Sequence, residues 1–161
     1  MSRPHVRTEL PWLRSGPIHK VHTSVVGEMD ALIERAGYLR IDLDGSVMTS
    51  RAAAHAEIGR ALGFPDWYGP SWDGFNDCMG HFVIEHDGAL VAIVVNDVEA
   101  AAGAAPVTAI EVGWGFLEVK FGVIPTLGAG QTATIDLDVF MVGDGPDFDR
   151  PPSLDVGPQN S

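Results

Sequence analysis

The sequence predicts an α/β protein with a small, mostly parallel sheet of three to four strands covered by helices. Strand-like apolar runs over 39–43, 89–95 and 135–139 alternate with segments whose apolar residues recur at helical spacing. Strands separated in this way by helices favour parallel pairing. The chain has 161 residues, of which 45% are hydrophobic, enough for one compact core.

The first 37 residues divide into two predicted parts. Residues 1–17 carry scattered charges and prolines, so we expect a flexible N-terminal arm. A domain over 18–142 follows. It opens with a short edge strand over 18–22 and a helix from Val25 or Val26 to Ala36, and Gly37 ends that helix.

The next segment predicts a half-buried strand and a capped helix. Apolar and polar residues alternate over 39–44, and Gly45 breaks the run. Thr49 or Ser50 can cap a helix that continues to Leu62. The glycine that follows it is a suitable end.

Downstream, the pattern predicts two helices, two strands and a tail. A helix over 72–83 is followed by 89–95, a run without alternation that is typical of a central strand buried on both faces. A second helix is indicated by four apolar residues at i, i+4, i+7 and i+11: Ile110, Trp114, Leu117 and Phe121. The last strand alternates over 135–139, and residues 143–161, rich in Asp, Gly and Pro, form a predicted disordered acidic tail.

The charge of the chain is concentrated in its C-terminal part. The net charge is −12, and residues 61–161 hold fifteen acidic but only two basic side chains. Nucleic acid and anionic membranes repel such a surface, so we predict neither as a partner and expect a basic protein instead. High solubility alone is the simpler interpretation of the same charge.

Cysteine content and hydropathy indicate a cytoplasmic protein. Cys78 is the single cysteine, so no intramolecular disulfide can form. The first 17 residues lack the apolar run of a signal peptide, and no apolar segment approaches the ~20 residues of a membrane span.

The helix predicted over 72–83 has an acidic face. Its apolar face comprises Trp72, Phe75, Met79 and Phe82. Asp73 and Asp77 lie about 40° apart on nearly the opposite face, and Ser71 is a suitable N-cap. No Lys or Arg occurs between Arg60 and Lys120 to neutralise the two carboxylates. An acidic pair of this kind is also common on ordinary solvated helices, and the helix dipole by itself favours an acid in the first turn.

An aromatic turn precedes this helix. Trp67 and Tyr68 are held between Pro65 and the Gly69-Pro70 pair. Aromatic side chains beside exposed carboxylates are typical of protein-binding hot spots. The alternative is that one or both rings pack inward as a hydrophobic staple.

Residues 62–69 and 72–79, LGFPDWYG and WDGFNDCM, resemble the barstar family of bacterial ribonuclease inhibitors. Residues 43–46 also fit the end of that family's first strand. The resemblance implies a non-enzymatic protein without a cofactor or metal, which inserts an acidic loop and helix into a ribonuclease active site. Its implied partner-binding residues are Trp67, Tyr68, Gly69, Ser71, Asp73, Asn76 and Asp77.

Within this resemblance, the two aspartates would mimic RNA phosphates, and Glu118 is a candidate for a further acidic contact by position only. Ser71 stands where the family often has asparagine, and Asn76 stands where the best-known member has tryptophan. Residues 18–37 and the acidic tail are additions to the family pattern. A barstar-fold scaffold without a ribonuclease partner is therefore an alternative function.

A magnesium-dependent phosphatase is the strongest enzyme alternative. Residues 41–46 resemble the first motif of haloacid-dehalogenase-type phosphatases, with Asp42 as nucleophile and Asp44 as acid/base. Lys120 would then bind phosphate, and 143–147 would bind magnesium. Against this hypothesis, the strand alternates, and the chain becomes rich in proline where that fold needs another helix and strand.

Two further candidate sites have simpler explanations. Asp73, Asp77 and His81 share a helix face, but the first and last lie two turns apart, too far to chelate one ion. Cys78 lies towards the apolar face, where we expect a small buried side chain instead of a nucleophile.

Overall fold

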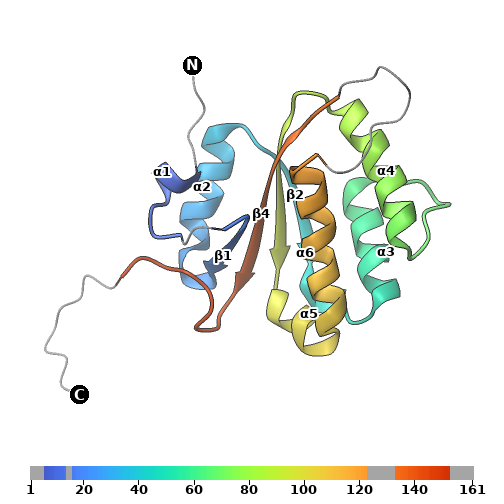
Figure 1. Cartoon of the computed structure of the whole chain (residues 1–161). Coiled ribbons are helices and arrows are strands. Elements are labelled where there is room, and N and C mark those ends of the chain that lie inside the picture. The colour runs from blue at the N-terminus through green and yellow to red at the C-terminus, as the bar shows by residue number, and fades with distance from the viewer. Residues whose placement is uncertain (1–5, 14–15, 123–132, 153–161) are drawn as a thin grey trace, which may run out of the picture.

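The structure, a computed structural model, describes residues 6–13, 16–122 and 133–152. Its sheet has four strands, β1 (Ile18–His22), β2 (Leu39–Asp44), β3 (Leu90–Asn96) and β4 (Asp136–Gly143). Their order is β1-β4-β3-β2, and every neighbouring pair is parallel (Figure 1). The predicted α/β class with a mostly parallel sheet is confirmed.

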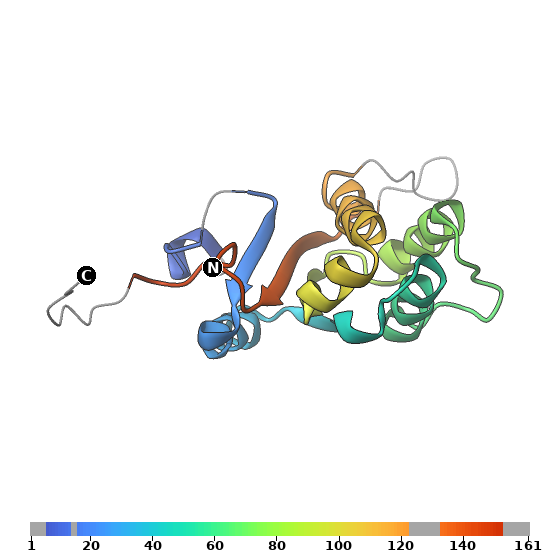
Figure 2. The same cartoon turned by 90° about the horizontal axis from the view of Figure 1, so that it is seen from below.

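Helices cover both faces of the sheet. They are α1 (Val6–Glu9), α2 (Val26–Ala36), α3 (Arg51–Leu62), α4 (Trp72–Glu85), α5 (Val98–Ala104) and α6 (Pro106–Lys120). Two short 3-10 turns, η1 (Thr23–Val25) and η2 (Gly45–Val47), follow β1 and β2. Helices α1 and α2 lie on one side of the sheet, and α3 to α6 lie on the other (Figure 2).

Each layer has its own apolar core, and β3 contributes to both. Successive strand residues point to opposite faces, so Val91, Ile93 and Val95 pack under α3 to α6. Ala92 and Val94 pack under α1 and α2. This is why β3 is apolar throughout its centre, as the sequence predicts for an interior strand.

The capping signals in the sequence place the helices correctly. The Ser50 hydroxyl accepts a hydrogen bond from the amide of Ala53 at 3.1 Å and begins α3. Gly37 and Gly63 end α2 and α3 with left-handed φ angles of 78° and 68°.

Both ends of the chain differ from the prediction. Within the expected flexible arm, residues 6–9 form α1, and Val6, Leu10 and Leu13 are buried against the α2 layer. Their spacing of four and three residues is the helical signal that the charges and prolines obscure. Residues 1–5 and 14–15 lie outside the described residues.

Part of the predicted disordered tail is also ordered against the sheet. Asp149 donates its amide to the Lys20 carbonyl at 2.8 Å, and its carbonyl accepts the His22 amide at 2.9 Å. Asp149 therefore forms a parallel bridge with the edge strand β1. The rest of the tail, 153–161, is outside the described part of the chain.

The region 98–143 holds four further differences from the prediction. Helix α5 is absent from the prediction, and α6 begins at Pro106, before the first residue of the predicted apolar face. Strand β4 continues to Gly143 and lies between β1 and β3. Asp138, a polar residue of the alternating pattern over 135–139, is buried.

Buried Asp138 is held by a polar cluster that connects three elements. Its carboxylate accepts hydrogen bonds from the Tyr38 hydroxyl and from Lys120 Nζ at 3.1 Å, with His19 Nε2 at 3.7 Å. Burial alone would raise the pKa of Asp138, but the hydrogen bonds of His19 and Tyr38 and the charge of Lys120 hold it well below its usual range. The carboxylate is therefore ionised and paired.

We expect Asp138→Ala to lower the free energy of unfolding by about 3–5 kcal/mol, because it leaves the Lys120 ammonium and the Tyr38 hydroxyl without this partner. Urea denaturation at pH 7 measures the change. Asp77→Ala is the matched control, and since that carboxylate is exposed, it should stay within about 0.5 kcal/mol of the parent. Equal stability of the two variants would contradict a structural role for Asp138.

Candidate functional site

Helix α4 is fixed in orientation by its cap and by its buried face. The Ser71 hydroxyl accepts the Gly74 amide at 3.0 Å, so Ser71 is the N-cap that the sequence predicts. Phe75 and Met79 have no solvent exposure, and Phe82 is also buried. This apolar face is the predicted one, and the helix runs two residues further, to Glu85.

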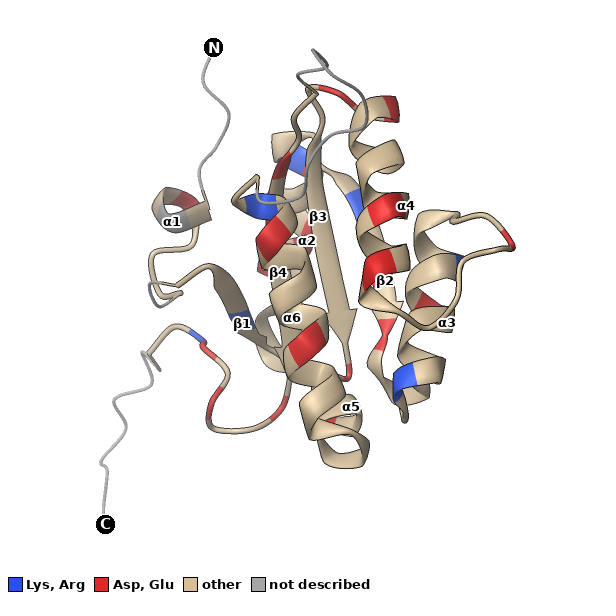
Figure 3. Cartoon of the chain, turned by 45° about the vertical axis from the view of Figure 1, so that its right-hand side comes forward, with Lys and Arg blue, Asp and Glu red and all other residues tan. Residues whose placement is uncertain are grey.

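Asp73 and Asp77 lie on the opposite, exposed side of α4. Within the described residues, neither carboxylate makes a hydrogen bond or an ion pair. The cations that bracket this part of the sequence are engaged elsewhere: Arg60 Nε donates to Glu57 at 2.7 Å, and Lys120 binds Asp138. Figure 3 shows acidic positions along α4 and α6 and no basic position on α4. Among the residues that the structure describes, the acidic face of α4 therefore has no counterion.

The two aromatic residues of the turn have opposite orientations. Trp67 is 63% exposed. Tyr68 packs inward, its ring against α3 where a Cβ on Gly59 would lie 3.0 Å from the ring carbon Cδ2. Its hydroxyl shares a hydrogen bond with His55 Nδ1, and burial raises the pKa of Tyr68. Tyr68 is thus the hydrophobic staple. Of the two aromatic side chains of the turn, Trp67 is the one that is open to a partner.

The backbone between these rings and α4 is held by short hydrogen bonds. The Tyr68 amide donates to the Pro65 carbonyl at 2.9 Å, and the Ser71 amide donates to the Gly69 carbonyl at 2.7 Å. Gly69 itself is half-buried and has open space where a Cβ would stand. Since Gly69 shows no positive φ angle, the turn does not require glycine there.

His55 is a residue at this site that sequence reasoning missed. It is buried on α3, with its ring 4.4 Å from that of Trp72. Its Nε2 has no hydrogen-bond partner among the described residues. Burial, together with the nearby Arg51 charge, lowers the pKa of His55, so the neutral ring anchors Tyr68 at pH 7. No sequence motif marks this histidine.

The predicted apolar face of α6 is wrong, because the structure turns most of it towards solvent instead of the core. Ile110 and Trp114 are 72% and 64% exposed, and Phe121, just after the helix, is exposed too. The core side is a different set: Val112, Phe116 and Val119. Because both sides of the helix are apolar, spacing alone does not distinguish the buried side.

The outward side of α6 and the neighbouring part of α4 form a hollow of about 310 Å³, here called the α4–α6 groove. Its walls are Trp72, Asn76, Ile110, Trp114 and Gly115, with Glu111 and Glu118 beside them. Asn76, a predicted partner-binding residue, therefore lines the same groove as Glu118, the acidic candidate placed only by position.

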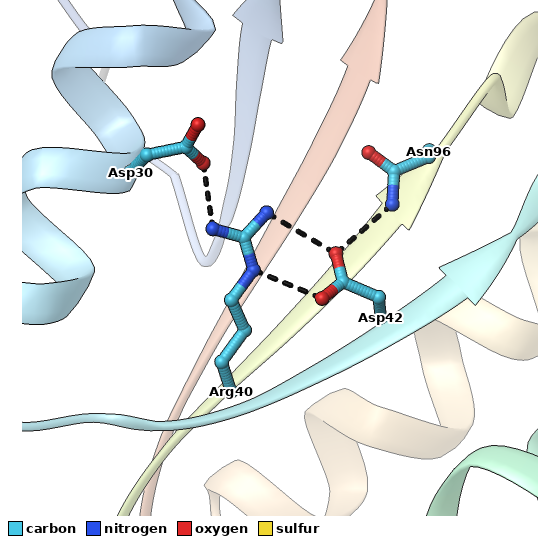
Figure 4. A network of polar contacts seen from close by, with 4 residues as sticks. All are labelled: Asp30, Arg40, Asp42 and Asn96. Carbon is cyan, nitrogen blue, oxygen red and sulfur yellow. Dashed lines mark hydrogen bonds and ion pairs between the residues drawn. The ribbon is translucent and has the colours of Figure 1, made fainter.

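The residues of the phosphatase alternative belong to separate networks. Asp42 accepts hydrogen bonds from Arg40 Nε at 3.0 Å and Asn96 at 3.1 Å, and Arg40 also binds Asp30 (Figure 4). Asp44 instead accepts the Ser46 amide at 2.9 Å as a cap. The third member, Lys120, is bound to Asp138. Each group has a structural role in this arrangement.

Neither metal binding nor thiol chemistry gains support at α4. In the portions of the chain that the structure describes, no three His, Cys, Asp or Glu side chains are placed to hold one metal ion, and this includes Asp73, Asp77 and His81. Cys78 is buried, and burial and the Asp77 charge both raise the pKa of its thiol.

Residues 38–113 match the family model described as Barstar (barnase inhibitor). These residues belong to the barstar family. The matched barstar segment runs from β2 through α5 into α6 and contains all the predicted partner-binding residues from Trp67 to Asp77. The family is one of inhibitors, not of enzymes. No curated protein matches the chain. Among the described helices, none is both long and apolar enough to cross a membrane.

The buried His55 makes the free energy of unfolding depend on pH. Its folded-state pKa lies below the ordinary 6.5, so the unfolded chain takes up the proton first. Stability should therefore fall as the pH drops below about 6.5, and this part of the slope should disappear in His55→Gln. Urea denaturation between pH 7 and 5 measures how the free energy of unfolding changes with pH, and proton NMR follows the protonation of the His55 ring. Titration of the His55 ring above pH 6.5 would contradict the argument.

Proposed function

We propose that the protein binds and inhibits a basic ribonuclease by inserting the loop and helix of residues 67–77 into its active site. The observation that carries the proposal is the pair Asp73 and Asp77, exposed on one face of α4 and without a counterion in the described part of the chain. The family description, barnase inhibitor, supports a ribonuclease as the partner class.

Electrostatics support this partner class. An active site that binds RNA phosphates must be positively charged, so two adjacent carboxylates on a rigid helix can occupy the positions of phosphates. The same charges attract the partner over long distances and raise the association rate. Within the described part of the chain, no cation has to be released from these carboxylates first, because Arg60 and Lys120 are paired with Glu57 and Asp138.

The loop adds apolar contact area beside the charges. Trp67 presents most of its indole to solvent, whereas Tyr68 fixes the turn from below. A loop that is already fixed in the free protein loses less conformational entropy on binding than a flexible loop, so a larger part of the contact energy contributes to affinity. In this arrangement Gly69 lets the partner approach the backbone closely, since it carries no side chain.

Barnase is the first probe, and inhibition of its cleavage of a fluorogenic RNA is the measurement. We expect Asp73→Ala and Asp77→Ala each to weaken binding by about 2–5 kcal/mol, because each leaves a partner cation buried and unpaired in the complex. Both variants should also reduce the dependence of the association rate on salt concentration.

Glu34→Ala is the matched control, because it removes one exposed acidic charge from α2, on the other side of the sheet. It should leave inhibition within about twofold of the parent. If barnase remains fully active, and immobilised protein retains no ribonuclease from the source organism's lysate or secreted fraction, the barstar fold serves here as a scaffold and the inhibitor proposal is wrong.

A further inference from the structure

The geometry points to the α4–α6 groove as a second binding site, which takes an apolar side chain that a cationic protein presents between Lys or Arg residues. The partner class rests on the proposed function, and the groove would be the place where that same protein makes apolar contact beyond residues 67–77. The inference stands on the shape of the groove, its exposed side chains and its charges.

Two lining residues of the groove, Gly115 of α6 and Trp72 of α4, lie in close contact. A Cβ on Gly115 would lie 2.9 Å from ring carbon Cζ3 of Trp72, too close for any other residue without a shift. The Trp72 ring therefore rests directly on the backbone of α6. Space remains open on the outer side of this contact, between Asn76 of α4 and Trp114 of α6.

The outer wall of the groove is apolar without being part of the core. Ile110 and Trp114 line the groove. Val107, outside the groove, continues the same stripe along α6 by a spacing of three and four residues, and each of the three side chains is more than 60% exposed. Exposed apolar side chains that are contiguous in this way, unlike single scattered ones, favour an interaction surface. The core side of the same helix is already filled by Val112 and Phe116.

The rim of the groove is acidic, and this determines the charge of the occupant. Trp72 Nε1 donates to Glu111, and Trp114 Nε1 donates to Glu118 at 2.7 Å. Both indoles are satisfied within the chain, and both carboxylates are held beside the groove. Neither glutamate pairs with a cation in the described residues. An apolar side chain flanked by Lys or Arg complements this arrangement.

Charge also argues against a second copy of the chain as the occupant. Each copy carries a net charge of −12, and the groove lies beside the acidic faces of α4 and α6. Two such faces would repel each other. The groove is instead continuous with the proposed ribonuclease contact, because Asn76 belongs to both.

The test uses the full chain and a synthetic pentapeptide with phenylalanine between two lysines on each side. Calorimetry and NMR shift mapping should give saturable binding at the groove. Affinity should fall about tenfold or more when alanine replaces the phenylalanine, when glutamate replaces the lysines, or in the Ile110→Ser variant. Val47→Ser, which changes another exposed apolar residue outside the groove, should bind like the parent.

Three results would overturn the inference: no saturable binding, equal binding of the glutamate peptide, or unchanged affinity in Ile110→Ser. Sedimentation of the parent as a dimer that Ile110→Ser dissociates would assign the groove to a second copy instead. Barnase inhibition separates the two proposals. If the peptide binds but barnase is not inhibited, only the ribonuclease proposal is wrong. If barnase is inhibited equally by the parent and by Ile110→Ser, and the peptide does not bind, only the groove proposal is wrong.

Discussion

The complete burial of Phe75 and Met79 is the constraint on which the exposed acidic surface depends. These two side chains occupy the core between α4 and the sheet, and they fix the rotation of the helix about its axis. A rotation by one residue, about 100°, would move a carboxylate towards the core, where an unpaired charge is strongly disfavoured. Core packing therefore keeps Asp73 and Asp77 in solvent, and no local interaction is needed to hold them there.

Packing of Tyr68 fixes the loop before the helix in a similar way. Gly59 lets the Tyr68 ring lie against α3, and His55 holds its hydroxyl from below. A tyrosine anchored in this way leaves its neighbour Trp67 outside. Two adjacent aromatic residues that look equivalent in the sequence thus have different roles, one in stability and one open to a partner.

The sequence predicts well those elements whose apolar pattern fits only one arrangement. Strand β3 and helix α4 have unambiguous patterns, and both are correctly placed. Helix α6 is apolar all round, so its spacing fits two faces, and the exposed one was mistaken for the core. Asp138 could not be found, because Tyr38, which helps to make its burial tolerable, lies 100 residues away in the sequence. The partner of His55, Tyr68, is 13 residues away and outside the helix that carries His55, so helical spacing does not reveal it.

The barstar segment contains the acidic helix, but it cannot account for the whole fold. Strand β4 lies outside residues 38–113, yet it pairs with β3 from Leu90 to Val95 and separates it from β1. Without β4, one edge of a wholly apolar strand would lack its hydrogen-bond partner, and both cores would lose Leu137 and Phe140.

Helices α1 and α2 cover the face of the sheet opposite to α4, and β1 is an edge strand of that sheet. These elements therefore contribute to the stability of the sheet that carries the acidic helix. Under the proposed function, partner choice would arise on the other side of the sheet, from residues 67–77 and the adjoining groove.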